Sequence, residues 1–252
     1  MREKIVVVCD WLLWCWASVI YWLLCITTKT KFEVRGETKL SKNHWYLLIA
    51  NHQSWADIVV IYSMFRNQIP MAKFFLKQQL LYVPFLGMAC WALNMPFMKR
   101  HSTQYLLRNP DKRSDDLAAT RKACEVFKCS PTTIVNFVEG TRFNPVKKPA
   151  GAHYEYLLLP KTAGIAHALD VMGDRFKTII DVTIAYPKNK GSVFVNLLAG
   201  KVKHIVIDVE AVPVDDVLRG DYLNDKEFKQ SFQKWLMQRW KIKDHKLKRI
   251  YQ

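Results

Sequence analysis

The chain has 252 residues, of which half are hydrophobic and 24% are charged. This apolar content excludes a disordered chain, and the low glycine and proline counts (nine and ten) exclude collagen-like and low-complexity classes. Lys and Arg number 38 against 22 Asp and Glu, a formal net charge of +16. Such an excess favours polyanionic partners: nucleic acid, anionic lipid headgroups, or phosphorylated and CoA-like substrates.

The six cysteines indicate a reducing compartment. None forms a C-x-x-C pair and no histidine cluster lies beside them in the sequence, so their spacing does not predict a zinc site. Three of them, Cys9, Cys15 and Cys25, lie in an apolar N-terminal stretch, where cysteine behaves as a small hydrophobic residue. A chain this long with so few cysteines is not typical of a disulfide framework.

The N-terminal stretch, residues 5–26, carries a single charge, Asp10, and is about as long as the 20 or so apolar residues of a membrane-spanning helix. Its four tryptophans are typical of a helix near the membrane–water interface. We predict membrane attachment, with spanning and lying in the interface both left open. The alternatives are an internal helix of a soluble core and a cleaved signal peptide, although no small-residue cleavage site follows.

Five basic residues follow this stretch, namely Lys29, Lys31, Arg35, Lys39 and Lys42. By the positive-inside rule, they predict that the rest of the chain faces the cytoplasm. We therefore expect a membrane-anchoring segment at 1–31 and one domain at 32–252.

From residue 32 onward, short β-rich runs alternate with amphipathic helices. Strands are expected at 45–50, 95–98, 132–138, 179–185, 193–198 and 205–209. Helices are expected at 55–65, at 76–93 with a break near Pro84 and Gly87, and at 115–127, 161–169 and 225–240. This alternation predicts an α/β fold with a mixed, mainly parallel sheet covered by helices.

A first candidate site, N-H-Q-S-W-A-D, directly follows the strand expected at 45–50. His52 and Asp57 would lie about 140° apart on a continuous helix, so they meet only if His52 is in the loop and Asp57 in the first helical turn. Ser54, a good N-cap, supports that break. The carboxylate would then fix the histidine tautomer and leave the other ring nitrogen to accept a proton.

The same residues also fit a purely structural interpretation. Ser54 and Asp57 have the spacing of a capping box, with an acidic residue in the first turn complementing the helix dipole. His52 would then be an exposed loop residue.

A second candidate site, F-V-E-G-T-R, follows the strand expected at 132–138. Gly140 allows close backbone approach to a ligand, and neighbouring amides can bind an anion or oxyanion. Arg142 offers a planar fork for phosphate, and Glu139 could support that arginine or contact a substrate hydroxyl. The alternative is an ordinary turn with a surface ion pair.

A third segment, F-M-K-R, places Lys99 and Arg100 at a strand end, where they suit a phosphate or form a solvated surface pair.

Taken together, N-H-x-S-x-x-D, F-M-K-R and F-V-E-G-T-R, in this order and at these separations, resemble the glycerolipid acyltransferase family, whose best-known members are the 1-acylglycerol-3-phosphate (lysophosphatidic acid) acyltransferases. The resemblance covers roughly residues 32–215. The spelling around the second and third segments looks closest to the bacterial YihG-type branch, related to eukaryotic lysocardiolipin-type enzymes. The V-T-I-A-Y-P block and K-Q-Q-L depart from the usual family patterns, which bears on the identity of the acceptor.

The resemblance implies a mechanism. His52 would be the general base that removes a proton from a glycerol hydroxyl, and Asp57 would orient it. The alkoxide would attack the thioester of acyl-CoA or acyl-carrier protein directly, without a covalent acyl-enzyme, cofactor or metal. Amides near Gly140 would stabilise the oxyanion. Acceptor binding would fall to Lys99, Arg100, Glu139, Gly140, Thr141 and Arg142.

The resemblance also implies a location and partners. The enzyme would act at the cytoplasmic face of the inner membrane, held to anionic lipids, on a lysophospholipid or on glycerol 3-phosphate. Two other classes stay open: a membrane-tethered nucleic-acid-binding module, which the charge suggests but no docking motif supports, and an acyltransferase-like protein that binds lipid without catalysis.

Overall fold

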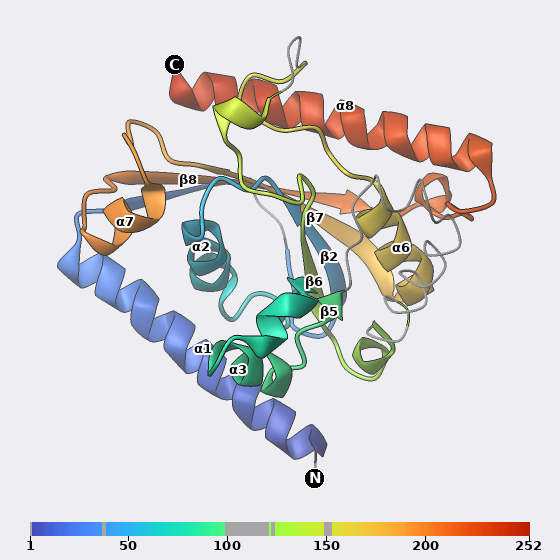
Figure 1. The fold of residues 1–252 in the computed structure, drawn as a ribbon, viewed down its shortest axis with the longest axis horizontal. Coiled ribbons are helices and arrows are strands. Elements are labelled where there is room, and N and C mark those ends of the chain that lie inside the picture. The colour runs from blue at the N-terminus through green and yellow to red at the C-terminus, as the bar shows by residue number, and fades with distance from the viewer. Residues whose placement is uncertain (1, 37–38, 99–120, 122–123, 149–152) are drawn as a thin grey trace.

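A computed structural model describes residues 2–36, 39–98, 121, 124–148 and 153–252 (Figure 1). The predicted α/β fold is confirmed: a six-stranded, mainly parallel sheet in the order β1–β8–β7–β2–β6–β3 has helices on both faces. The strands are β1 (Lys31–Arg35), β2 (Trp45–Ala50), β3 (Ala72–Phe74), β6 (Thr133–Phe137), β7 (Phe176–Ala185) and β8 (His204–Pro213).

The central strand β2 explains why the sheet is mainly parallel. Its sequence, WYLLIA, is apolar at every position, and residues 46–50 are buried, as expected for a strand covered on both faces. It pairs in parallel with both β6 and β7, while β7 and β8 pair antiparallel. A small second sheet joins β4 (Leu76–Lys77) to β5 (Phe97–Met98).

The helices divide between the two faces of the sheet (Figure 1). One face is covered by α1 (Arg2–Thr27), α2 (Ala56–Phe65), α3 (Leu86–Ala92) and α7 (Val193–Leu198). The other is covered by α6 (Ala163–Met172) and α8 (Lys226–Tyr251). Short 3-10 helices occupy Gln78–Tyr82, Val126–Lys128, Pro145–Lys147, Gly173–Arg175 and Asp216–Leu218.

One expected strand is wrong, because residues 193–198 form the helix α7. The run VFVNLL favours a strand by composition, but the Ser192 side chain accepts a hydrogen bond from the Val195 amide and caps a helix. The sequence also failed to predict β1 and β3, and α8 continues to Tyr251, well beyond its expected end at residue 240. Most of the helix expected at 115–127 lies outside the described residues.

The N-terminal helix α1 lies along the domain and contacts it through one face. Ala17 is buried, and Leu13, Trp14 and Leu24 pack against the core at helical spacing. Asp10, on the same face, forms an ion pair with the buried Lys73 of β3, with 2.5 Å between Oδ1 and Nζ. Among the described residues, Val8–Thr27 is the one helical stretch long and apolar enough to cross a membrane.

Candidate active site

His52 and Asp57 meet at the carboxyl end of β2, where the chain passes into α2. The distance from His52 Nδ1 to Asp57 Oδ2 is 2.8 Å. The histidine side chain is 14% exposed and the aspartate is fully buried. The sequence prediction that a break between strand and helix brings these two side chains together is confirmed.

The structural role expected for Asp57 is present as well. Its Oδ2 accepts the backbone amides of Gln53 at 2.7 Å and Ser54 at 2.9 Å, as a residue at the start of a helix can. The predicted capping role of Ser54 is present too, because its Oγ accepts the Ala56 amide at 3.2 Å, although the helix as assigned begins at Ala56. One carboxylate therefore both organises the loop and contacts the histidine ring.

This arrangement determines what the imidazole of His52 can do. When Nδ1–H donates to Asp57, the opposite nitrogen, Nε2, carries the lone pair that can accept a proton. The ring stacks on Phe137 with centroids 4.0 Å apart, and the His52 carbonyl accepts the Phe143 amide at 2.6 Å. Ring and backbone are thus both held, and the geometry suits a general base.

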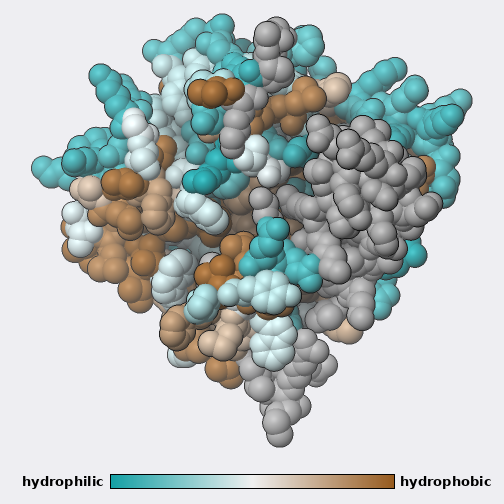
Figure 2. Space-filling view, viewed as in Figure 1, coloured by the Kyte–Doolittle hydropathy of each residue, from teal (hydrophilic) through white to brown (hydrophobic). Residues whose placement is uncertain are grey.

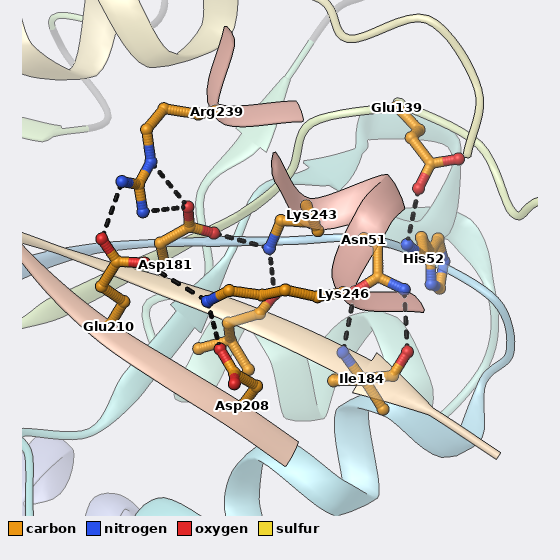
Figure 3. Close-up of polar contacts among 11 residues, drawn as sticks. Asn51, His52, Glu139, Asp181, Ile184, Asp208, Glu210, Arg239, Lys243 and Lys246 are labelled. Carbon is orange, nitrogen blue, oxygen red and sulfur yellow. Dashed lines mark hydrogen bonds and ion pairs between the residues drawn. The ribbon is translucent and has the colours of Figure 1, made fainter. Parts of the chain in front are cut away.

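Glu139 lies behind His52 and contacts backbone rather than solvent (Figure 3). It is 1% exposed, and its two oxygens accept the amides of His52 and Leu158, each at 2.9 Å. Burial raises the pKa of this carboxyl to about 7, although the two amides act to lower it. The side chain clamps the histidine loop to residue 158, and its contact with an acceptor stays a prediction.

Cations gather at the turn that follows β6. Gly140 has φ +69°, a conformation that favours glycine, and its amide donates to the Phe137 carbonyl, so this amide is already used within the turn. A Cβ at Gly140 would lie 3.1 Å from Lys161 Nζ. The Arg142 guanidinium lies 5.3 Å from the ring centroid of the exposed Trp55. Lys161 and Arg142 thus flank Thr141, which adjoins Gly140, beside the histidine loop.

The structure places the predicted residues unevenly. His52, Asp57, Glu139, Gly140 and the exposed Arg142 come together around the ends of β2 and β6. Lys99 and Arg100 lie outside the described residues, so their place in the site stays a prediction.

Sequence reasoning missed three residues near the site. Tyr186 donates to Asp57, Tyr251 donates to Gln53, and Lys161 lies beside Gly140. Tyr186 was visible in the V-T-I-A-Y-P block, but Tyr251 is 198 positions from Gln53 and carries no local signal.

Two other features lie outside this site. A cavity of about 370 Å³ lies between β1, β8 and the end of α2, where Val34, Phe65 and Ile207 contribute to its lining, and it does not touch His52. Within the described part of the chain, no group of three or more His, Cys, Asp or Glu side chains could hold a metal ion.

Comparisons with known proteins point to one family. The Acyltransferase family model matches residues 31–187, which include every described residue of the site except Tyr251. The chain is 26% identical to lysocardiolipin acyltransferase 1 of Danio rerio over 94% of this chain and 60% of that protein. It is 24% identical to human 1-acyl-sn-glycerol-3-phosphate acyltransferase gamma, over 94% of this chain and 61% of that protein.

The fold has a solved counterpart in PlsC, the 1-acyl-sn-glycerophosphate acyltransferase of Thermotoga maritima. The TM-score is 0.55 at 20% identity, covering 95% of this chain and 80% of PlsC. The chain spans about three-fifths of the length of the animal relatives named above, and its assignment to the YihG-type branch stays a prediction. The match over residues 31–187, which is more than half of the chain, shows that the chain belongs to the Acyltransferase family.

Proposed function

We propose that this acyltransferase moves an acyl chain from acyl-CoA or acyl-carrier protein to the free hydroxyl of a lysophospholipid, either 1-acylglycerol 3-phosphate or a related lysolipid. The observation that carries the proposal is the pairing of His52 with the buried Asp57 carboxylate, which accepts further hydrogen bonds, at the carboxyl end of a central strand. The acceptor class follows the names of the relatives, which act on lysophosphatidic acid and lysocardiolipin.

In the proposed reaction, His52 Nε2 takes the proton of the acceptor hydroxyl while the oxygen attacks the thioester carbonyl. The C–S bond then breaks, the acyl group stays on the acceptor oxygen, and the proton passes from His52 to the departing thiolate. Asp57 stabilises the imidazolium that forms in between. A positioned base of this kind contributes about 10²- to 10⁴-fold to the rate.

Positive charge near the histidine suits both substrates. Arg142 and Lys161 lie at the turn after β6 and would bind the acceptor phosphate, together with Thr141. Lys99 and Arg100 belong to this proposed phosphate site, and the donor is a polyanion as well. Glu139 takes part by holding the His52 amide.

The proposal includes attachment to the cytoplasmic face of the inner membrane through α1. Large apolar side chains point outward along this helix and are 46–78% exposed, as for Trp11 at 62%, Trp22 at 59% and Ile26 at 78%. The hydrophobic face of the molecule in Figure 2 includes the region of α1 and α7, whereas α8 is covered mostly by hydrophilic residues. An exposed apolar surface of this kind is typical of a membrane contact.

The test is an assay of the purified protein with radiolabelled acyl-CoA and acyl-carrier protein donors and a panel of acceptors. The panel contains lysophosphatidic acid, other lysophospholipids and glycerol 3-phosphate, and the products are separated as lipids. We expect the wild type to acylate a lysophospholipid and His52→Ala to lose about 10²- to 10⁴-fold in rate. His44→Ala is the matched control, because His44 is exposed and lies just before the opposite end of β2.

Two results would overturn parts of the proposal. Equal rates for wild type and His52→Ala would remove the mechanism. Absence of product with every acceptor would remove the activity and favour an acyltransferase-like protein that binds lipid without catalysis.

A further inference from the structure

Tyr186 stands out because its polar end is buried and turned to the catalytic pair, although it lies 129 positions from Asp57 in the sequence. The residue is 2% exposed, and its phenol donates to Asp57 Oδ1 at 2.6 Å. This is the carboxylate oxygen that His52 does not contact, since Nδ1 meets Oδ2. The two oxygens of Asp57 are therefore held from two sides, by the loop after β2 and by the end of β7.

The end of β7 is positioned to deliver this phenol. Asn51 continues the pairing of β2 with β7 through its side chain: Nδ2 donates to the Ile184 carbonyl and Oδ1 accepts the Ile184 amide, each at 2.9 Å (Figure 3). Tyr186 follows two residues later. An unpaired carboxamide would be costly at this buried position, so the two bonds fix the register at which Tyr186 leaves the sheet.

The last turn of α8 secures the same arrangement. The Tyr251 hydroxyl accepts the Tyr186 amide at 3.1 Å and donates to Gln53 Oε1 at 2.9 Å. The backbone amide of Gln53 in turn donates to Asp57 Oδ2. Tyr251 is itself held by stacking on Tyr156, with ring centroids 4.9 Å apart. One phenol therefore joins the strand that carries Tyr186 to the loop that carries His52.

We propose that Tyr186 is a positioning residue of the acyl transfer, which holds Asp57 in the orientation that aligns His52 and withdraws charge from the carboxylate, and that Tyr251 secures it. This inference rests on the proposed function for its effect on rate. Without the phenol, Asp57 accepts one hydrogen bond fewer, so the His52–Asp57 pair binds a proton more tightly. His52 then stays protonated, and unable to act as a base, up to a higher pH.

The surrounding groups show that the phenol acts as a donor. Burial, together with the neighbouring Asp57 carboxylate, raises the pKa of Tyr186 well above its ordinary value, so it keeps its proton. Among the described residues, other titratable or charged groups near the pair include Glu139 after β6, Arg142 and Lys161 at the neighbouring turn, and Tyr251 and Lys243 on α8. Because burial raises the pKa of Glu139 to about 7, a test must observe the histidine itself as well as the rate.

The experiment compares Tyr186→Phe with Tyr62→Phe in the full chain. Tyr62 is a matched control, because it is also buried and donates its hydroxyl at 2.8 Å, but to the Ala72 carbonyl. With lysophosphatidic acid as acceptor, we expect Tyr186→Phe to lower kcat about 10- to 100-fold with little change in KM. The acidic limb of kcat/KM should move up by about half to one pH unit. Tyr251→Phe should do the same to a smaller extent.

A second measurement does not depend on activity. NMR of histidine-labelled protein, with the His52 signal assigned by its loss in His52→Ala, gives the midpoint of the imidazole titration. We expect this midpoint to rise in Tyr186→Phe and to stay unchanged in Tyr62→Phe. An unchanged midpoint in Tyr186→Phe, or equal kinetics for the two phenylalanine variants, would overturn the inference. An inactive wild type with a shifted midpoint would overturn the proposed function alone.

Discussion

The two longest helices, α1 and α8, have the same length and cover opposite faces of the sheet, yet their outer surfaces differ (Figure 1). Helix α8 buries an apolar stripe that includes Phe232, Leu236 and Trp240, and most of its remaining positions are polar or charged. Helix α1 packs one apolar stripe on the domain and exposes another. The outer face of α8 suits water, whereas that of α1 suits an apolar medium such as lipid.

The helices also differ in how charge attaches them to the sheet. Three cations of helix α8 pair with three acidic side chains of β7 and β8 in one network (Figure 3). Its members are Arg239, Lys243, Lys246, Asp181, Asp208 and Glu210. In the described part of α1, a single pair joins Asp10 to Lys73. Among the described residues, charge therefore holds α8 to the sheet through more ion pairs than α1.

The largest effect is expected when the α8 network loses its central acid. Asp181 contacts both Arg239 and Lys243, and the Lys243 side chain is 1% exposed. Asp181→Ala leaves a buried ammonium without its carboxylate and should cost about 3–5 kcal/mol in the free energy of unfolding. Urea denaturation at pH 7 measures this loss.

Asp208→Ala is the control within the same network. Asp208 pairs with Lys246, whose side chain is 30% exposed, so a loss of about 1 kcal/mol or less is expected. Similar losses in the two variants would show that burial does not distinguish the members of the network.

An intermediate effect is expected for the pair that holds α1. Burial lowers the pKa of Lys73, and Asp10 opposes this shift. Asp10→Asn should therefore cost on the order of 2 kcal/mol at pH 7, less than Asp181→Ala because Asp10 is 26% exposed. Between the lowered pKa and the ordinary value of 10.5, the unfolded chain binds more protons, so stability rises with pH in that window.

Without Asp10, burial lowers the pKa of Lys73 further, so the variant gains stability with pH over a wider window than the wild type does. The loss caused by Asp10→Asn should therefore shrink between pH 7 and pH 10, as measured by denaturation at both values against wild type. A loss that stays constant over this range would mean that the charge of Lys73 does not matter to the docking of α1.

The smallest effect on stability, and the largest on membrane binding, is expected for the outer face of α1. Trp11→Ser with Trp22→Ser should change the free energy of unfolding by only about 0.5 kcal/mol, because both side chains are exposed. Binding to phosphatidylglycerol vesicles should weaken about 10-fold or more per tryptophan. Vesicle co-sedimentation measures this.

The matched control places the same change on α8. Met237 and Ile242 are 45% and 39% exposed there, and replacing both by Ser should leave vesicle binding unchanged. An equal decrease for the two helices would remove the distinction between a lipid-facing and a water-facing side.

The contact between His52 and Asp57 was predictable because its determinants are local. His52 and Asp57 are five positions apart, and a strand end followed by a helix start is enough to bring them close together. Local signals failed where short runs have two interpretations: VFVNLL favours a strand by composition but follows a capping serine and forms α7. The three-residue strand β3 carries Lys73 and gave no periodic signal.

The sequence alone determined the class of the fold, the apolar character of α1 and the residue types of the site. These features could be predicted because strand hydrophobicity, helix length and turn chemistry act over short stretches. Only the tertiary structure decided what surrounds His52. The parallel order that places β6 and β7 on either side of β2 brings Glu139 and Tyr186 to one edge, and α8 adds Tyr251. These contacts join residues up to 198 positions apart, and strand order and helix packing, rather than any local pattern, create them.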